Sequence, residues 1–567
     1  MTNSSTRWIL HTQNPALSSK ISQNLAVHPI IAQILLNRQI RSLDQANQFL
    51  NPINSEYSIN FEADLLEKSC ALIQDCIKNK KKILIYGDYD ADGITAVTML
   101  IQALKKAGAD ADYHIPHRFH EGYGLNMGFV KHLAQSSCSL LIALDCGISN
   151  FKEIEYLNKQ SSIKTMIFDH HSLPVKLPDA NVIINPKTLA ESHPLRDLCT
   201  AGIVYKFIEF FAQTTCPKLN PADFLDLAAI GTIADITPLT GENRRIVNLG
   251  LVQLSKRWRK GIDLLLETAQ FKRSRISPRD VGFVIAPRLN ASGRLAHAKL
   301  GVELLLASTN SDAEKLAVQL NQLNEKRRHL DSSVYQEAKA SILENDLDKK
   351  HPVLTIASTG WHAGVIGITA SKLAGTFCKP TVLISFDENT GRGSARSIGN
   401  INIYALLEKC QDLFIAFGGH KQAAGFSILP EKISEFQTRF IAVSQPEINP
   451  SDLNPVIEID AKLSASDLNL ELAETLSKLE PFGEGNPAPL FYTNDLIPID
   501  FKPVGDGSHL KARFTNQENS LVIDSIGFGL SHKLDVLYKK EVELVFSLEV
   551  NEWNNSKSPQ LNLVDIK

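Results

Sequence analysis

The stretch from Gly87 to Gly93 holds the side chains best suited to chemistry in this chain. Asp88, Asp90 and Asp92 stand at alternate positions within it. Like charges this close repel one another, and a bound cation offsets that repulsion. The two glycines allow a tight turn and the close approach of a ligand. A solvated acidic turn would have the same sequence, so other parts of the chain must decide between the two interpretations.

The elements that position these acids are predicted to be buried parallel strands. The runs 83–86, 140–144 and 165–168 are apolar without alternation, which is typical of strands covered on both faces. The Asp-rich turn follows the first run, and Asp145 follows the second. Open parallel sheets bind ligands beyond the carboxyl ends of their strands. We therefore expect an α/β fold with the acids at one edge of its sheet.

Two further segments add imidazole groups and another carboxylate. Asp169, His170 and His171 follow the third run, and Asp235 ends the apolar stretch 227–234. Carboxylates together with imidazole suit Mn²⁺, and they suit Mg²⁺ less well because Mg²⁺ prefers oxygen. Two such ions close together favour the hydrolysis of phosphoesters.

These motifs resemble the DHH phosphoesterase superfamily and, within it, the RecJ family of bacterial single-strand-specific exonucleases. The resemblance extends from about Lys80 to the C-terminus, and the preceding residues are less diagnostic. Beyond the acidic segments it rests on motifs at 115–118, 287–294, 360–367, 394–397, 417–420 and 481–487. In this order and at this spacing the motifs are specific to the family.

The resemblance implies a role for each residue of the acidic site. The expected metal ligands are Asp90, Asp92, Asp145, His170 and Asp235. Two ions, Mn²⁺ or Mg²⁺, are expected, with Asp145 bridging them. The residues expected to act beside them, as ligands or by orienting a ligand, are Asp88, Asp169 and His171. The ions would activate a water and stabilise the charge that develops on the phosphoryl oxygens.

A second α/β unit is expected to hold the substrate, because its motifs supply glycine, arginine and histidine but no acids. Arginine grips phosphate with paired hydrogen bonds. Arg396, beside Ser394, is the leading candidate for a terminal 5′-phosphate. The other expected substrate contacts are Arg118, Arg294, His362 and His420. For Arg288 and Arg392 an interdomain salt bridge is an equal alternative, and Trp361 and Phe417 are expected in the core rather than against bases.

Patterns along the chain predict five regions. No Gly or Pro occurs from Ser311 to His351, which predicts a helix of about 35 residues, capped at Ser311-Asp312, that joins two domains across a cleft. Residues Leu521, Ile523, Ile526 and Phe528, and then Val542, Leu544, Phe546 and Leu548, alternate as strands do. With the identities that the resemblance implies, the expected regions are a helical region at 1–80, the DHH domain at 81–240, a helical segment with the long helix at 241–350, a DHH-associated clamp at 351–450, and an OB-like β-barrel at 455–567.

Composition excludes some classes of protein. The chain has 567 residues, 43% of them hydrophobic, and a net charge of −3. These values are typical of a folded protein with several domains, not of a disordered one. No apolar stretch approaches the ~20 residues of a membrane span, and no signal core begins the chain. Eight cysteines without a C-x-x-C pair argue against a disulfide framework or zinc ribbon. We expect a cytoplasmic monomer with no membrane partner.

The resemblance implies a metal-dependent 5′→3′ exonuclease of single-stranded DNA that acts in DNA repair and recombination. Its implied partners are single-stranded DNA with a 5′-phosphate end, single-strand-binding proteins and helicases. One alternative is another DHH activity: a manganese pyrophosphatase, or a phosphodiesterase for short oligonucleotides or cyclic dinucleotides. A second alternative is an inactive DNA-binding scaffold, against which the complete set of candidate ligands argues. The residues alone leave DNA versus RNA, the metal and the strand polarity open.

Overall fold

The computed structural model describes residues 6–54, 61–518, 520–539, 541–553 and 556–567. These residues form two compact units. One is made mainly of residues 8–289 and 458–567, and the other mainly of residues 315–457. No helix among the described residues has both the length and the apolar character needed to cross a membrane.

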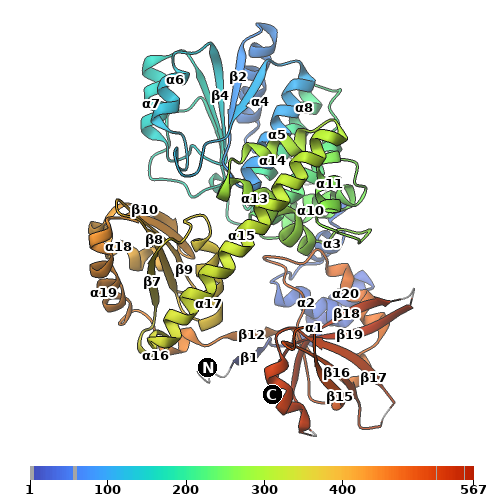
Figure 1. The fold of residues 1–567 in the computed structure, drawn as a ribbon. Helices are drawn as coiled ribbons and strands as arrows, with labels where there is room; N and C mark the ends of the chain where they lie inside the picture. The colour runs from blue at the N-terminus through green and yellow to red at the C-terminus, as the bar shows by residue number, and fades with distance from the viewer. Residues whose placement is uncertain (1–5, 55–60, 519, 540, 554–555) are drawn as a thin grey trace. The chain divides into compact units, whose positions relative to one another are not determined.

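Within the first unit, residues 82–184 contain a parallel five-stranded sheet (Figure 1). Its strands, in spatial order, are β3 (Ala111–His114), β2 (Lys82–Tyr86), β4 (Cys138–Leu144), β5 (Lys164–Phe168) and β6 (Val182–Ile184). Every neighbouring pair is parallel. The residues 140–144 are all buried, as their unbroken apolar run predicts.

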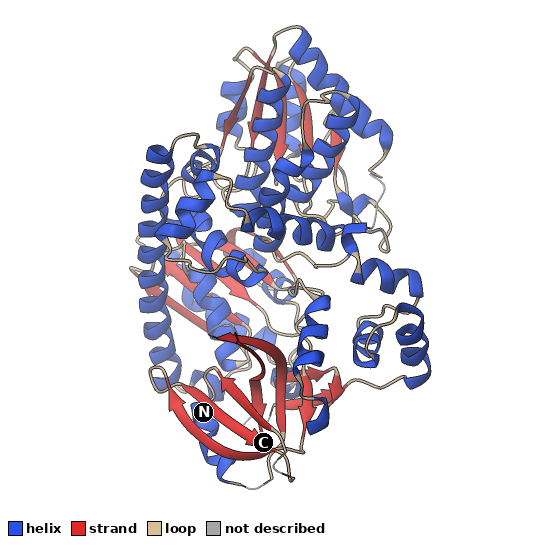
Figure 2. Ribbon diagram, turned by 90° about the vertical axis from the view of Figure 1, so that its right-hand side faces the viewer, coloured by secondary structure: helices blue, strands red, loops and turns tan. Residues whose placement is uncertain are grey.

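Helices cover both faces of this sheet (Figures 1 and 2). On one face, α6 (Met127–Leu133) and α7 (Phe151–Gln160) share a hydrophobic core with β4 and β5. The other face is covered by α4 (Ala63–Lys78), α5 (Ala91–Ala107) and α8 (Thr200–Thr214). The run 227–234, which ends at Asp235, lies in helix α9 (Leu225–Ala234). Helices α10 (Gly241–Ser255), α11 (Lys260–Thr268), α12 (Pro278–Asp280), α13 (Ala286–Leu295) and α14 (Lys299–Leu306) follow in the chain, with a π-helical turn at Val281–Ile285 before α13.

The first helices of the chain share one hydrophobic core with its C-terminal β domain. The helices are α1 (Pro15–Leu25), α2 (Pro29–Asn37) and α3 (Leu43–Leu50), preceded by strand β1 (Arg7–Leu10). Ile31 and Leu35 of α2 are buried in the same cluster as Phe491, Phe514 and Phe546. The sequence predicted helices here but not their partner, because the two segments are more than 400 positions apart.

The C-terminal β domain is a mixed seven-stranded sheet. Its elements are β13 (Ala461–Lys462), α20 (Leu470–Leu476), β14 (Phe491–Thr493), β15 (Ile497–Val504), β16 (His509–Thr515), β17 (Val522–Gly527), β18 (Leu544–Trp553) and β19 (Ser556–Ile566). Val542, Leu544, Phe546 and Leu548 are buried as expected, but Val545 and Ser547 are buried too, so this strand does not alternate between a buried and an exposed face. The alternation expected at β17 is wrong: Ile523 is buried but Phe528 is 56% exposed, because positions 521 and 523 face opposite to 526 and 528.

The second unit holds another five-stranded sheet, in the order β10-β11-β9-β8-β7. Its elements are β7 (Leu354–Thr359), α17 (Ile366–Phe377), β8 (Thr381–Phe386), β9 (Gly391–Arg396), α18 (Ile403–Glu408), β10 (Phe414–His420), β11 (Ala423–Ile428) and α19 (Ile433–Ser444). Strand β12 (Val456–Ile459) follows. Trp361 is buried, and Phe417 packs against Tyr404 and Phe414, so both lie among core side chains as expected.

The long helix is α15 (Asn310–Glu344), and its 35 residues match the expected length. It starts one residue before the predicted cap: the Thr309 hydroxyl, not Ser311, accepts the backbone N–H of Asp312 at 3.1 Å. The helix ends before His351 because Asp346 adopts a left-handed conformation, φ 52°, and a separate turn, α16 (Leu347–Lys350), follows.

Candidate metal centre

The Asp-rich turn joins β2 to α5 and is too tight for a side chain at Gly93. A Cβ on Gly93 would lie 2.6 Å from the carbonyl oxygen of Asp88. Asp90 caps α5, because its Oδ1 accepts the N–H groups of Asp92 at 3.0 Å and Gly93 at 3.2 Å. Asp88 is buried, and its Oδ1 has no hydrogen-bond partner in the described part of the chain. The turn thus presents a buried carboxylate oxygen that no protein group satisfies.

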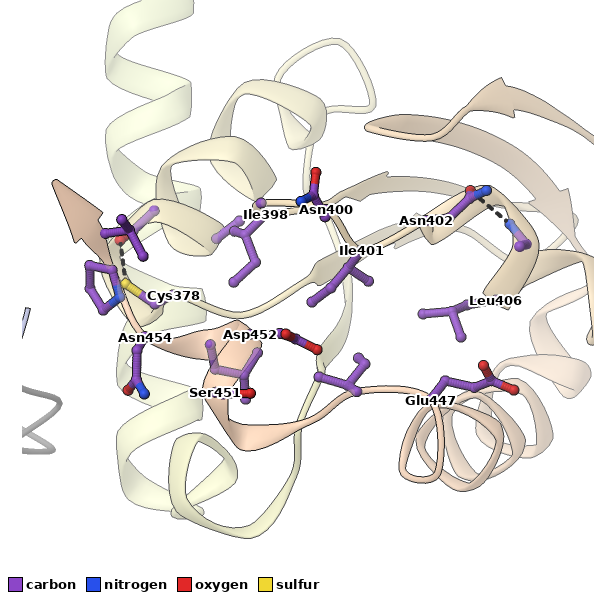
Figure 3. Close-up of a pocket in the computed structure, with 18 of the residues that line it drawn as sticks. Cys378, Ile398, Asn400, Ile401, Asn402, Leu406, Glu447, Ser451, Asp452 and Asn454 are labelled. Carbon is purple, nitrogen blue, oxygen red and sulfur yellow. Dashed lines mark hydrogen bonds between the residues drawn. The ribbon is translucent and has the colours of Figure 1, made fainter. Parts of the chain in front are cut away.

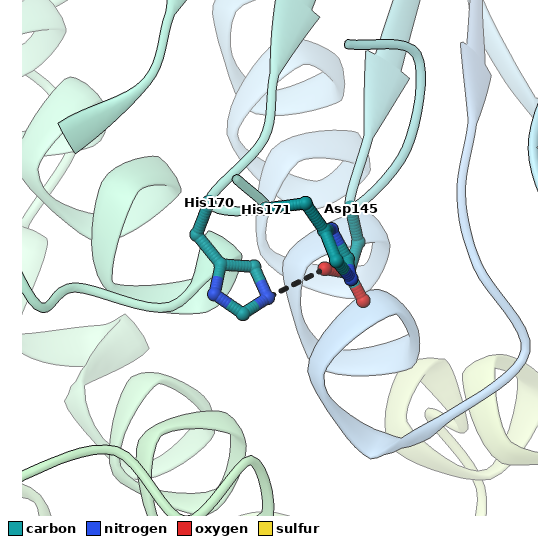
Figure 4. Close-up of side chains that lie close together, drawn as sticks. All are labelled: Asp145, His170 and His171. Carbon is teal, nitrogen blue, oxygen red and sulfur yellow. Dashed lines mark ion pairs between the residues drawn. The ribbon is translucent and has the colours of Figure 1, made fainter. Parts of the chain in front are cut away.

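Asp145 lies at the end of β4 in a left-handed conformation, φ 63°. This conformation is uncommon for a residue other than glycine, and such strain collects at functional sites. Its Oδ1 accepts a hydrogen bond from the Thr200 hydroxyl at 3.0 Å and lies 3.3 Å from Nε2 of His170. Figure 4 shows this ion pair. The ligand atoms of Asp145, His170 and His171 all lie within 4.8 Å of one another.

Asp169 holds His171 in place rather than facing the acidic cluster. It is fully buried, and its Oδ1 lies 2.7 Å from Nδ1 of His171. Its Oδ2 accepts the Ile148 N–H at 3.1 Å. The Tyr123 hydroxyl donates to the Asp145 carbonyl and lies 3.1 Å from Nδ1 of His171. The side chain of His171 is 45% exposed, so it stays accessible from solvent.

Asp92 and Asp235 complete the arrangement around His170. Both oxygens of Asp92 accept backbone N–H groups at the start of α8, from Thr200 at 2.8 Å and Ala201 at 2.7 Å. Nε2 of His170 lies 4.0 Å from Oδ2 of Asp92, and Nδ1 lies 3.6 Å from Oδ2 of Asp235. The imidazole thus faces carboxylates with both of its nitrogens.

The possible ligand atoms gather in three groups, within each of which all atoms lie no more than 4.8 Å apart. The groups are Asp88, Asp90 and Asp145; Asp92, His170 and Asp235; and Asp145, His170 and His171. Asp145 and His170 each belong to two groups. All five residues expected as metal ligands are therefore brought together, with Asp88 and His171 beside them, and Asp169 stands outside the groups.

The pKa values show that the cluster holds more negative charge than its surroundings balance. Burial and the nearby Asp145 raise the pKa of Asp90 to about 6. Burial and the Asp145 carboxylate raise the pKa of Asp235 to about 7, although His170 opposes the shift. The pKa values of Asp88 and Asp92 are raised well above the usual range for the same reasons, burial first. A cation among these groups would offset the repulsion, so the donor set fits a divalent ion.

Asp145 and His170 form a strongly favourable pair within this centre. Burial alone would raise the pKa of Asp145, but the hydrogen bond and charge of His170 lower it. Burial alone would lower the pKa of His170, but Asp145 and then Asp235 raise it to about 10. Without an ion, the imidazolium therefore supplies the positive charge that the carboxylates require.

Two of the expected substrate residues lie side by side on β9 in the other unit. Nη1 of Arg396 donates to the Ser394 hydroxyl at 3.1 Å and to the Ala395 carbonyl at 2.8 Å. A Cβ on Gly367, near the start of α17, would lie 2.8 Å from Nη2 of Arg396 and 2.9 Å from the Ser394 hydroxyl oxygen. The helix backbone therefore closely approaches both polar groups.

Arg294 and His362 meet at the turn before α17. Nη1 of Arg294 donates to the Gly364 carbonyl at 3.0 Å, and Nδ1 of His362 accepts the Gly364 N–H at 3.0 Å. His420 pairs with Ala423 in the sheet, and Ala423 pairs with Arg396. The side chains of His420 and Arg396 therefore point to one face of the sheet, two strands apart, about 10 Å at the usual strand spacing.

Arg118 belongs to the first unit, with the acidic cluster. Its guanidinium carbon lies 4.8 Å from the ring centre of Tyr89, and its charge acts on Asp88. Arg118 was expected to contact substrate from the first domain, and it lies there beside the Asp-rich turn.

A cavity of about 650 Å³ in the second unit contains none of the candidate residues. Figure 3 shows apolar side chains, including Ile398, Ile401 and Leu406, together with asparagines around it. One acidic group in its lining, Glu447, is paired with Lys409. This cavity is therefore unlike a metal or phosphate site.

Sequence reasoning missed Thr200, Ala201 and Tyr123. Thr200 and Ala201 act through backbone N–H groups at a helix start, and Thr200 also through its hydroxyl. Polar groups at helix starts commonly bind anions, but no spacing in the sequence ties this start to Asp92 and Asp145. Tyr123 lies between two glycines with positive φ, Gly122 and Gly124, a signal of a turn but not of a site.

Three family models match separate regions of the chain. Residues 82–232 match the DHH family, N-terminal domain; residues 350–445 match the DHHA1 domain; and residues 459–565 match the RecJ OB domain. The single-stranded-DNA-specific exonuclease RecJ of Haemophilus influenzae is 34% identical over 96% of this chain and 97% of that protein. The protein of that name from Bacillus subtilis is 33% identical over 100% of this chain and 71% of its own length.

Solved structures agree with these matches. RecJ from Thermus thermophilus in complex with Mn²⁺ superposes with a TM-score of 0.85 at 27% identity, over 100% of this chain and 80% of that one. An exonuclease RecJ bound to manganese gives a TM-score of 0.60 at 30% identity, over 70% of this chain and 100% of that one.

Proposed function

The chain belongs to the RecJ family of single-stranded-DNA-specific exonucleases, and we propose that it hydrolyses single-stranded DNA at a centre for two divalent cations. The observation that carries the proposal is the convergence of three ligand groups on Asp145 and His170. Asp145 is the residue shared by the carboxylate group and by the group that holds both histidines, so it is suited to bridge two ions.

The residues of this chain divide into those that hold ions and those that orient them. One ion would be held by Asp88, Asp90 and Asp145. The other ion would be held by Asp92, His170 and Asp235, and Asp145 would bridge the two ions. Either Mn²⁺ or Mg²⁺ suits the carboxylates, and the imidazole favours Mn²⁺. When bound, the ions would supply an activated water and neutralise charge on the phosphoryl oxygens.

The groups around the cluster would fix its geometry. The N–H groups at the start of α8 hold both oxygens of Asp92, and the Thr200 hydroxyl holds Oδ1 of Asp145. Asp169 orients His171, whose exposed ring would face the scissile phosphate. Hydrogen bonds of this kind to ligating side chains raise the precision of metal sites.

The second unit would bind the 5′-terminal phosphate. Arg396 and Ser394 offer a guanidinium and a hydroxyl within 3.1 Å of each other, beside the start of α17. A terminal phosphate carries more charge than an internal phosphodiester, so a guanidinium discriminates between them. Anchoring the 5′ end would place the first bonds of the strand in register and would give 5′→3′ polarity.

The first experiment is digestion of end-labelled single strands and duplexes with Mn²⁺, Mg²⁺ or EDTA. We expect mononucleotides to be released from the 5′ end of single strands in Mn²⁺ or Mg²⁺, and no cleavage in EDTA. Cleavage of short oligonucleotides alone would support the oligonucleotide phosphodiesterase alternative. Metal-independent cleavage, or no cleavage at all, would contradict the proposal.

A second experiment tests the 5′-phosphate anchor with Arg396→Ala. Loss of one charged hydrogen-bonding partner costs about 1.5–3 kcal/mol, or roughly ten- to 150-fold in affinity. We expect the preference for 5′-phosphate over 5′-hydroxyl strands to fall by that factor. Arg439→Ala is the control, because Arg439 of the same unit pairs with Asp412 and Glu435 and is not among the expected substrate contacts. An equal ratio in Arg396→Ala and wild type would place the anchor elsewhere.

A further inference from the structure

The loop 480–487 of the C-terminal β domain lies against the segment that follows Asp235. The N–H of Leu239 donates to the carbonyl of Glu484 at 2.7 Å. Only three residues separate Asp235 from Leu239. The β domain thus contacts the protein backbone directly beside a candidate metal ligand.

The contact is close-packed as well as hydrogen-bonded. Gly485 has φ +68°, and a Cβ on it would lie 2.9 Å from the Cβ of Pro238. A Cβ on Gly483 would lie 2.7 Å from Cδ1 of Leu239. Real Cβ atoms do not approach neighbours this closely, so a methyl group at either position must displace the residue it meets. The loop therefore fits the segment at Pro238 and Leu239 without free space.

Buried polar groups make this loop rigid. Asn486 is fully buried, and its Nδ2 donates to the carbonyls of Leu479 and Pro481, each at 2.8 Å. Arg244 of α10 is also buried, and its Nη2 donates to the Glu480 carbonyl at 2.7 Å. A loop fixed from within and from α10 cannot yield easily when its neighbour moves.

The guanidinium of Arg244 also joins the loop to the first helices of the chain. Its Nε donates to the Phe49 carbonyl at 2.8 Å, and its Cζ lies 3.9 Å from the centre of the Phe49 ring. Phe49 belongs to the core that α1–α3 share with the β domain. The loop that contacts Pro238 and Leu239 is thus connected, through Arg244 and Phe49, to the core that the N-terminal helices share with the β domain.

The segment after Asp235 needs such support because its conformation is strained. Ile236, a β-branched residue, has φ 58° and is 70% exposed. A left-handed conformation is strongly unfavourable for such a residue and persists only where surrounding contacts impose it. The Thr237 hydroxyl donates to the Thr232 carbonyl of α9 at 3.0 Å, and Nδ2 of Asn243 of α10 donates to the Pro238 carbonyl at 3.1 Å. The loop 480–487 adds its own contacts at Pro238 and Leu239.

We infer that the loop 480–487 positions Asp235 for metal binding, so that docking of the C-terminal β domain and occupancy of the metal centre are linked. The inference rests on the proposed function, since it takes Asp235 as a ligand. Gly483, Gly485 and Arg244 are positioning residues: none of them belongs to a ligand group, and they act through Pro238 and Leu239. Linkage is reciprocal, so bound metal must stabilise the loop as much as the loop favours metal.

The test compares Gly485→Ala with Gly507→Ala in the full-length protein. Both glycines have positive φ, +68° and +87°, so both substitutions carry similar backbone strain. Only the methyl group at 485 meets Pro238, whereas at 507 no described atom lies within 4 Å. Mn²⁺ is titrated calorimetrically into the metal-free proteins. Loss of groups that orient ligands typically costs about ten- to 100-fold in metal affinity. We expect such a loss in Gly485→Ala and none in Gly507→Ala.

Hydrogen exchange provides a second measurement that does not depend on activity. We expect Mn²⁺ to slow exchange of the amides in 480–487 in the wild type and to have little effect on them in Gly485→Ala. If Gly485→Ala does not fold, Gly483→Ala replaces it, because the Leu239 side chain can move away from the added methyl group. The inference is overturned, and the proposed metal centre is not, if a folded variant binds Mn²⁺ with wild-type affinity and Mn²⁺ slows exchange in its loop as it does in the wild type. Absence of Mn²⁺ binding by the wild type would instead overturn the proposed metal centre.

Discussion

Asp145 and Asp235 contact the same imidazole, yet removing their charges should have opposite effects on the metal-free fold. Asp145 is paired with His170 so well that its pKa is lowered. Burial and the Asp145 carboxylate raise the pKa of Asp235 to about 7, so its ionised form is unfavourable. One carboxylate therefore stabilises the metal-free protein near neutral pH, and the other destabilises it.

Asp145→Asn should remove hydrolysis by several orders of magnitude, because it removes the candidate bridging ligand. It should also destabilise the metal-free protein by about 1.5–3 kcal/mol, since His170 loses a charged hydrogen-bond partner. Activity assays with Mn²⁺ and chemical denaturation in EDTA measure the two effects. Asp112→Asn, a surface carboxylate 3.9 Å from Lys82, is the control. Wild-type turnover in Asp145→Asn would refute the two-ion centre.

Asp235→Asn should stabilise the metal-free protein, and more so as pH rises. A group whose pKa is raised on folding contributes stability below its unfolded pKa, here 3.8, and loses it as pH rises through the folded value, about 7 for Asp235. The folded state binds the proton more tightly, so between these values wild-type stability falls with pH. The difference in melting temperature between variant and wild type in EDTA should grow from about pH 5 to about pH 8. A constant difference would mean that Asp235 has an ordinary pKa.

Mn²⁺ should bind more tightly as pH rises, because the ion replaces protons. The pKa of Asp90 is raised to about 6 and that of Asp235 to about 7, so both carry protons in part of the population near pH 6. Binding near pH 6 should therefore release protons. Calorimetric titration in two buffers of different ionisation enthalpy measures the number released. Equal heats in both buffers at about pH 6 would contradict the prediction.

The residue types that form the site could be predicted from sequence, but their supports could not. Each acid that follows a strand lies where parallel strands place ligands, so Asp145 and Asp169 were found from the apolar runs before them. The distinct task of Asp169, which is to hold His171, depends on a contact that the sequence does not encode locally. The same is true of Tyr123, whose hydroxyl reaches the Asp145 carbonyl from a loop 22 residues earlier.

At the scale of elements, the start of α8 acts on two carboxylates at once. Its first N–H groups hold Asp92, and the Thr200 hydroxyl holds Asp145. Thr200→Val keeps the shape and the backbone N–H groups but removes one hydrogen bond to a charged acceptor, which costs about 1.5–3 kcal/mol. We expect weaker Mn²⁺ binding with a folded protein, measured by titration. Thr214→Val, at the other end of α8, is the control. Unchanged Mn²⁺ affinity in Thr200→Val would show that the hydroxyl does not orient Asp145.

A second element, α15, contacts α17 through a shared apolar core, a hydrogen bond between Tyr335 and Thr376, and one buried carboxylate. Asp331 is buried, and it accepts the Thr369 hydroxyl at 2.8 Å and pairs with Lys372. Asp331→Ala leaves these partners unsatisfied, so we expect a loss of about 1–3 kcal/mol in the unfolding free energy of this unit. Chemical denaturation followed by Trp361 fluorescence measures it. Asn321→Ala, on α15 away from this contact, should change stability little.

Helices and strands were predicted well where a pattern within a short stretch of sequence determined them. The three apolar runs of the first sheet are strands, and the stretch without Gly or Pro is α15. Boundaries were less certain, because a threonine hydroxyl and a left-handed aspartate set the ends of α15. The exposed Phe528 shows the same limit: β17 buries positions 523, 525 and 527 in regular alternation, so the apolar residues at 526 and 528 fall on the opposite face.

At the scale of the whole molecule, the N-terminal helices and the C-terminal β domain must be removed together. A chain ending near residue 450 would leave the apolar faces of α1–α3 without the core that covers them. We therefore expect a 1–450 fragment to aggregate and a 61–450 fragment to be more soluble. The reason is that large exposed apolar patches promote association. Size-exclusion chromatography with light scattering compares the two fragments. Equal solubility would mean that α1–α3 fold without the β domain.

The joint core also has a consequence for how the protein is made. Helices α1–α3 leave the ribosome before the β domain, and their apolar partners begin at Ala461, more than 400 residues later. At about 5–20 residues per second, the nascent helices wait roughly 20–80 s before they can bury Ile31 and Leu35. During that interval the DHH sheet can form behind them. We therefore expect the apolar faces of α1–α3 to stay exposed during this interval, and the yield of folded protein to depend on the rate of synthesis.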